Sequence, residues 1–185
     1  GDYWLFTQTL DFTKKALTRA GWIEKVEFVE GAYFSPGWDK GESEWEKKAE
    51  ELMENKELDL IIGMGTDAVR ALLAKNNNTT PILGMGVSNA LKSGFIPNNH
   101  DSGKDNFTVR IVPGRYERMF EIFHQVISFK KLGLIYPNTE SGKNYTNLES
   151  AKEVAKKKGF EIVEYILEEE NTSSCLNGLK KIVTQ

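Results

Sequence analysis

The stretch Leu58–Ala68 reads Leu-Asp-Leu-Ile-Ile-Gly-Met-Gly-Thr-Asp-Ala and passes from an apolar run through two glycines to small polar residues. The stretches Pro81–Ala90 and Leu132–Ser141 follow the same plan. Short β-rich runs that are bounded by turn residues and followed by helical periodicity are typical of βα units in a parallel sheet. We therefore predict three strands, each opening a helix, over Leu58–Ile62, Ile82–Gly86 and Leu132–Tyr136.

The segments between these units also carry helix and strand patterns. Helical spacing of apolar residues, with Ser43 as an N-cap and Gly21 and Gly159 as stop signals, predicts further helices. These helices are expected over Tyr3–Ala20, Ser43–Asn55, Thr66–Ala74, Arg115–Val126, a long segment ending at Lys158, and Leu176–Val183. Additional strands are expected at Val26–Val29 and Phe160–Tyr165, with an extended segment at Phe107–Val112. Strands that alternate with helices favour an α/β fold with parallel sheets flanked by helices.

The layout predicts two lobes. Phe107–Val112 lies where one series of βα units ends and a second begins, so we expect a first α/β lobe over residues 1–112 and a second over 113–185, with this segment as a hinge. The chain opens on a helix, where a doubly wound domain normally opens with a strand. It also ends one βα unit into the second series, and two strands do not make an independent sheet domain. We therefore expect the first strand to be missing and the second lobe to be truncated.

The composition of the 185 residues is typical of a soluble globular protein, with 28% charged and 39% hydrophobic residues. The net charge of −3, with lysines and arginines scattered among acids, gives no reason to expect nucleic-acid binding. Cys175 is the one cysteine, which excludes an internal disulfide, and two histidines leave little for a metal site, so no cofactor is expected. Gly1 resembles a cut end, so a signal peptide is expected to have been removed.

The polar residues that follow the predicted strands do not form a catalytic set. The sequence lacks the GxSxG and GxxxxGK[ST] patterns, and Gly63-Met64-Gly65 lacks the third glycine of a dinucleotide fingerprint. In parallel sheets, ligands bind outside the carboxyl ends of the strands, where helix N-termini present free N–H groups. Hydroxyl and amide side chains at these positions indicate a binding site and not an enzyme active site.

The order of four phrases resembles the periplasmic substrate-binding components of ABC transporters, in the branch of uncharacterised proteins related to tryptophan-binding and other aromatic amino-acid-binding lipoproteins. The phrases are Asp59–Ala68, Pro81–Gly94, Lys131–Asn138 and Ala155–Glu164. Ser88-Asn89-Ala90 stands where that family usually has a Thr-Asp-Pro-like turn, so the polar group of the ligand is expected to differ.

The resemblance implies two lobes that enclose a ligand in an interlobe cleft, with no chemistry performed. It further implies an exported bacterial protein, lipid-anchored or free, in the periplasm or at the extracellular face of the cytoplasmic membrane. Such a protein would deliver a small polar ligand, for example an amino acid, to a membrane permease, and a monomer is expected. An extracellular sensing domain of a signalling protein is the alternative, and an α/β enzyme is less favoured.

The candidate ligand-binding residues lie at the predicted strand ends and at the start of the chain. They are Tyr3, Trp4, Gly65, Thr66, Asp67, Ser88, Asn89, Asn138, Thr139, Glu140, Ser141 and Tyr145. Several of them have an alternative structural explanation. Thr66 or Asp67 could serve only as an N-cap, and Asn138 or Ser141 could be simple turn residues. Tyr145 could pack on its own lobe, and the first residues could belong to a poorly ordered terminus.

Overall fold

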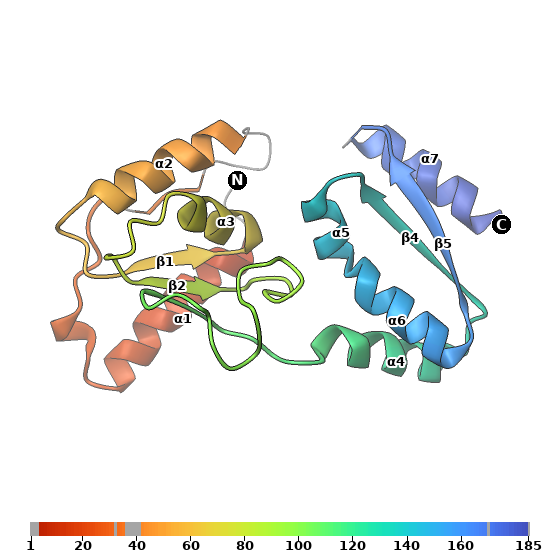
Figure 1. Ribbon diagram of the computed structural model, residues 1–185, viewed down its shortest axis with the longest axis horizontal. Helices are drawn as coiled ribbons and strands as arrows, with labels where there is room; N and C mark the ends of the chain where they lie inside the picture. The colour runs from red at the N-terminus through yellow and green to blue at the C-terminus, as the bar shows by residue number, and fades with distance from the viewer. Residues whose placement is uncertain (1–3, 32, 36–41, 170, 185) are drawn as a thin grey trace. The chain divides into compact units, whose positions relative to one another are not determined.

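The computed structural model describes residues 4–31, 33–35, 42–169 and 171–184 (Figure 1). The chain divides into two compact units. The first comprises residues 1–86 and 104–108, and the second comprises residues 87–103 and 109–185. Each unit combines parallel strands with flanking helices, which confirms the predicted α/β fold.

The first unit contains a sheet in the order β1-β2-β3, in which β1 and β2 are parallel and Ile61 pairs with Ile82. Its elements are α1 (Trp4–Arg19), the short 3-10 helix η1 (Ile23–Lys25), α2 (Glu42–Glu54), β1 (Ile61–Met64), α3 (Thr66–Ala74), β2 (Ile82–Met85) and β3 (Phe107–Val109). The helix predicted at Thr66–Ala74 therefore has the predicted bounds, and the strand predicted from Leu58 begins three residues later.

The core of the first unit lies between β1 and α3. Ile61, Ile82, Val69 and Leu72 are buried there. A Cβ atom on Gly63 would lie 2.9 Å from side-chain atoms of both Val69 and Leu72, so the helix packs directly on the bare backbone of the strand. Such close helix–strand packing fixes where α3 begins, and hence where the turn after β1 lies.

Two sequence predictions for the first unit are wrong. Val26–Val29 is not a strand, although Val26 has extended dihedral angles, and Val26 and Phe28 are both exposed. A short apolar run forms a strand only when a neighbouring strand pairs with it. Phe28 instead lies beside Lys14, whose Nζ atom is 4.7 Å from the centre of the Phe28 ring. Ser43 is not the N-cap of α2, because the helix already includes Glu42.

The second unit is built on β4 (Lys131–Pro137) and β5 (Glu161–Leu167), which pair in parallel along their whole length. Its helices are α4 (Arg115–Ile127), α5 (Glu140–Thr146), α6 (Leu148–Lys158) and α7 (Thr172–Val183). Phe120, Ala151, Val154, Ala155 and Phe160 form its buried core, with Phe129, Leu132, Leu134 and Ile162 packed against them. The ring of His124 stacks on Phe160, with 5.1 Å between the ring centres, and so belongs to this packing.

Helix α4 buries less of its surface than its apolar spacing predicts. Of the apolar side chains of this helix, Phe120 is buried, whereas Met119 and Phe123 are exposed and Val126 is 73% exposed. The helix packs mainly on α6. A single helix neighbour covers one narrow row of side chains, so most of the predicted stripe stays uncovered.

The long helix predicted to end at Lys158 is two helices. Asn147 has a left-handed conformation, with φ 53°, and separates α5 from α6. Asparagine tolerates this conformation better than other non-glycine residues, which explains why the break falls at this residue.

Among the described residues, no helix is both long enough and apolar enough to cross a membrane.

Candidate functional site

In the first unit, the turns after β1 and β2 lie next to each other. The Gly65 N–H donates a hydrogen bond to the Met85 carbonyl at 2.8 Å. Both turns need glycine, because Gly65 and Gly86 have φ values of 95° and 64°. Gly65 is also the N-cap of α3, and it offers no side chain to cap the helix. The first turn of α3 therefore starts at the carboxyl end of β1, as a βα unit requires.

The two residues that follow Gly65 do not cap the helix. Thr66 and Asp67 both lie inside α3, so the alternative that one of them is merely an N-cap is wrong. Thr66 is 0% exposed and is packed inside its unit, whereas Asp67 is half-buried. Of the two, Asp67 is therefore the more accessible side chain at this strand end.

Phe6 covers both glycine turns. Its Cζ atom lies 2.9 Å from the position of a Cβ atom on Gly65, and its Cε1 atom lies 3.7 Å from the corresponding position on Gly86. The sequence places Phe6 in a helical apolar pattern but does not reveal what it contacts. Two successive strands that are each followed directly by a glycine are the signal that a large side chain could lie against their turns. Trp4, in the same helix, is 60% exposed, and Tyr3 lies outside the described residues.

The residues after β2 form a turn and not the predicted helix. Asn89 is left-handed, with φ 47°, and its carbonyl accepts a hydrogen bond from the Ser93 N–H at 2.9 Å. Its side-chain Oδ1 accepts from the Lys92 N–H at 3.2 Å, and the Ser93 hydroxyl donates to the Ser88 carbonyl at 3.1 Å. These local hydrogen bonds compete with helix formation, which explains the wrong prediction.

The second unit contains a cavity of about 280 Å³. The turn after β2, helix α5 and the first turn of α6 supply its lining. The lining residues are Asn89, Lys92, Glu140, Lys143, Asn144, Asn147, Leu148, Glu149 and Ser150. Eight of these nine residues are polar or charged, so the cavity suits a small polar molecule.

The cavity includes two of the residues proposed from the sequence, Asn89 and Glu140. Thr139 lies beside it as the N-cap of α5, where its side chain accepts a hydrogen bond from the Gly142 N–H at 3.0 Å. Ser88, Asn138, Ser141 and Tyr145 are not part of the lining, and the Tyr145 side chain is exposed.

Lys92, Lys143 and Ser150 of the lining have acidic partners. The Lys92 Nζ lies 2.9 Å from the Glu153 carboxylate, and this hydrogen bond, with the nearby negative charges of Glu153, Glu149 and Glu117, raises the pKa of Lys92. The Lys143 Nζ lies 3.3 Å from the Glu140 carboxylate. The Ser150 hydroxyl donates to Glu117 at 2.6 Å. The Lys92 and Ser150 bonds join the turn and α4 to α6, whereas the Lys143–Glu140 pair lies within α5.

Asn147 lines the cavity at the junction of α5 and α6. Its Nδ2 donates to the Tyr145 carbonyl at 3.1 Å, and its Oδ1 is buried without a hydrogen-bond partner. The residue is 9% exposed. A buried acceptor that lacks a donor costs about 1–3 kcal/mol, so the cavity wall contains an acceptor that a donor would stabilise.

A second polar group in this unit has a structural role. The Tyr136 hydroxyl donates to Glu164, whose carboxylate lies 2.9 Å from the Lys152 Nζ. Burial and the hydrogen bond to Glu164 raise the pKa of Tyr136 to about 12. The hydrogen bond from Tyr136 and, as the next largest cause, the hydrogen bond from Lys152 lower the pKa of Glu164. The three side chains join β4, β5 and α6.

Replacing Tyr136 by Phe should lower the free energy of unfolding by about 1 kcal/mol near neutral pH, because Glu164 loses a donor but keeps Lys152. The folded-state pKa of Tyr136 is raised, so the stabilisation is full below pH 10 and is lost as the pH rises toward about 12. Urea unfolding at about pH 8 and at about pH 11 should show a gap between wild type and Tyr136→Phe that narrows at the higher pH. A gap of equal size at both pH values would contradict this assignment.

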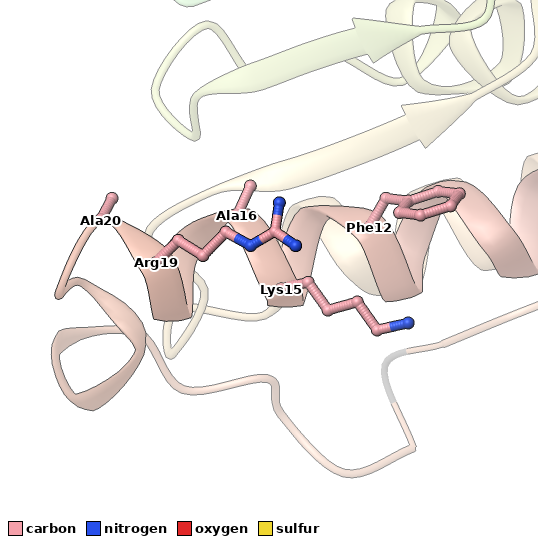
Figure 2. Close-up of a pocket in the computed structure, with 5 residues that line it drawn as sticks. All are labelled: Phe12, Lys15, Ala16, Arg19 and Ala20. Carbon is pink, nitrogen blue, oxygen red and sulfur yellow. The ribbon is translucent and has the colours of Figure 1, made fainter.

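A larger hollow, of about 630 Å³, lies along α1 in the first unit. Figure 2 shows its lining residues, which are Phe12, Lys15, Ala16 and Arg19 on this single helix and Ala20 directly after it. Phe12 is 63% exposed, and the Lys15 ammonium lies 5.5 Å from its ring centre. Polar groups do not converge on the hollow from several elements, so the cavity of the second unit is the better candidate.

In the part of the chain that the structure describes, no group of three or more His, Cys, Asp or Glu could hold a metal ion.

Comparison with known proteins shows similarity in fold. No family model and no curated protein matches the sequence. The ABC domain of Streptococcus pneumoniae in complex with L-Trp matches with a TM-score of 0.71 at 17% identity, over 95% of this chain and 58% of that chain. A conserved domain protein of Vibrio cholerae matches with a TM-score of 0.61 at 20% identity, over 77% of this chain and 46% of that chain.

The ligand-free, open structure of a substrate-binding protein with adhesive properties from Clostridium difficile matches with a TM-score of 0.53 at 20% identity, over 91% of this chain and 55% of that chain. The chain thus spans about half of the length of the solved chains that it matches. At these identities the similarity establishes the fold, which this chain shares with ABC substrate-binding proteins.

Proposed function

We propose that this protein is an extracytoplasmic solute-binding protein that captures a small polar ligand, such as an amino acid, and delivers it to the membrane permease of an ABC transporter. The observation that carries the proposal is the cavity of the second unit, where amide, ammonium and carboxylate groups converge from three segments of the chain. The shared fold with an L-Trp-bound ABC domain supports it. The protein would perform no catalysis and use no cofactor.

The cavity has the size and chemistry that an amino acid requires. Pockets for drug-sized ligands span about 300–1,000 Å³, so a volume of about 280 Å³ suits a smaller molecule. A zwitterion needs acceptors for its ammonium group and donors for its carboxylate, and the lining offers carboxylates, amides and lysines. The charged groups of the lining would fix the orientation of the ligand. The ligand must also leave unchanged to reach a permease, so none of these groups would react with it.

We further propose that the strand-end turns of the first unit contribute to ligand binding. The turns at Gly65 and Gly86 lie at the N-terminus of α3, and Phe6 supplies an apolar surface beside them. Asp67 is the accessible polar side chain at this position, and Trp4 is an exposed aromatic in the same unit. The positive end of a helix dipole favours a ligand carboxylate.

A thermal-shift screen of the protein against the L-amino acids, with L-tryptophan among them, tests the proposal. A compound that binds only the native state, present at a free concentration of 100 times its dissociation constant, should raise the free energy of unfolding by about 2.7 kcal/mol. The same mixtures should be unchanged after prolonged incubation, as followed by mass spectrometry. Failure of every amino acid to raise the melting temperature, or conversion of the bound compound into a product, would refute the proposal.

A further inference from the structure

The charges around the cavity of the second unit are unbalanced. Lys92 and Lys143 are the positive side chains of the lining, and each already has a carboxylate partner. The lining residues and their direct partners contain four carboxylates, those of Glu117, Glu140, Glu149 and Glu153. This set of side chains therefore has an excess of two negative charges. An anionic ligand group would meet repulsion here, and a cationic group would meet attraction.

Two acceptors in the lining have no partner among the described residues. Glu149 is exposed and forms no ion pair or hydrogen bond through its carboxylate, in contrast to Glu140. Asn147 keeps a buried Oδ1 without a donor. The amide of Asn147 cannot be turned over, because its Oδ1 would then face the Tyr145 carbonyl, which now accepts from Nδ2. The lining thus contains two hydrogen-bond acceptors to which no donor of the described residues bonds.

The N-terminus of α6 opposes a cation only weakly. Its macrodipole is equivalent to roughly half a positive charge that falls off within the first turn. Glu149 lies in that first turn and already offsets it. The excess of two negative charges outweighs this field, and the four carboxylates that produce it are spread over α4, α5 and α6.

We propose that the cavity of the second unit binds the cationic group of the ligand, a protonated primary amine, through the Glu149 carboxylate and the Asn147 amide oxygen. The inference rests on the proposed function and names the ligand group that this cavity recognises. An ammonium group has three donors, so it can bond to both acceptors at once. A neutral hydroxyl could satisfy Asn147 but would leave the excess negative charge unbalanced. The ligands selected here are amines and amino acids, and simple carboxylic acids are rejected.

Two compounds that share a phenyl ring and differ in charge test the inference. In NMR titrations of ¹⁵N-labelled protein, 2-phenylethylamine should shift the side-chain amide signals of Asn147 and Asn144, and 3-phenylpropionate should not. Glu149→Gln should weaken the amine about fivefold, an effect typical of a solvent-exposed ion pair. Glu161→Gln is the matched control, because Glu161 is an exposed carboxylate of the same unit that does not line the cavity.

Equal binding of the amine by wild type and Glu149→Gln would overturn the inference. So would binding of 3-phenylpropionate as strong as that of the amine, or no response to either compound. Each of these results leaves the proposed function to be decided by the amino-acid screen, because an amino acid could still bind through its carboxylate. Selective amine binding that depends on Glu149 and not on Glu161 supports the inference.

Discussion

Phe160→Ala should lower the free energy of unfolding by about 3–5 kcal/mol, the cost typical of emptying a buried phenylalanine site. Phe160 is 7% exposed and lies edge-on to Phe129, with ring centres 4.9 Å apart, while His124 stacks on it. Removing the ring takes away the contact that joins α4 to the start of β5. Small domains have a total stability of about 5–15 kcal/mol, so the loss is a large fraction of the whole.

Chemical denaturation followed by circular dichroism measures this loss, and Phe12→Ala is its control. Phe12 is exposed on α1, so its truncation should change stability by less than about 0.5 kcal/mol. Similar losses for the two variants would mean that Phe160 does not belong to a packed core.

Gly142→Ala should destabilise the second unit by about 1–3 kcal/mol and weaken ligand binding. An added Cβ atom would lie 2.5 Å from the Pro137 carbonyl oxygen, and a backbone atom cannot move aside as a flexible side chain would. Helix α5 must then shift away from β4. It carries Glu140, Lys143 and Asn144 of the cavity, so the geometry of the lining changes with it.

Ser173→Ala provides the comparison for Gly142→Ala, since Ser173 is an exposed residue near the start of α7 and alanine is well accepted in helices. Urea unfolding of both variants should show a loss for Gly142→Ala alone. A Gly142→Ala protein as stable as wild type would show that α5 is not fixed against β4 by this contact.

The fold could be predicted wherever local pattern and packing agree. The apolar run before Gly63, the buried Val69 and Leu72, and the stop signal at Gly159 predict β1, α3 and the end of α6 to within a few residues. The pattern fails where the chain lacks a neighbour. Val26–Val29 has the composition of a strand but pairs with no strand of the described residues, and the apolar stripe of α4 packs mainly on α6.

The candidate site was less predictable, because it depends on two irregular features. The rule that ligands bind near strand ends predicts Asn89 and Glu140, which lie in the segments that follow β2 and β4. Lys92 comes to the cavity through the turn that replaces a predicted helix, and Glu149 comes to it through the break at Asn147. A left-handed asparagine inside a helical pattern is only weakly signalled by sequence, so the convergence of these side chains appears only in three dimensions.

The central claim is that a small ligand binds in the cavity of the second unit, and NMR mapping of the strongest amino-acid ligand from the screen tests it most directly. The claim predicts that the side-chain amide signals of Asn89, Asn144 and Asn147 shift together with one dissociation constant. The amides of Asn171 and Asn177, which do not line the cavity, should stay unchanged. Shifts confined to residues outside the cavity, with Asn89, Asn144 and Asn147 unaffected, would contradict the claim.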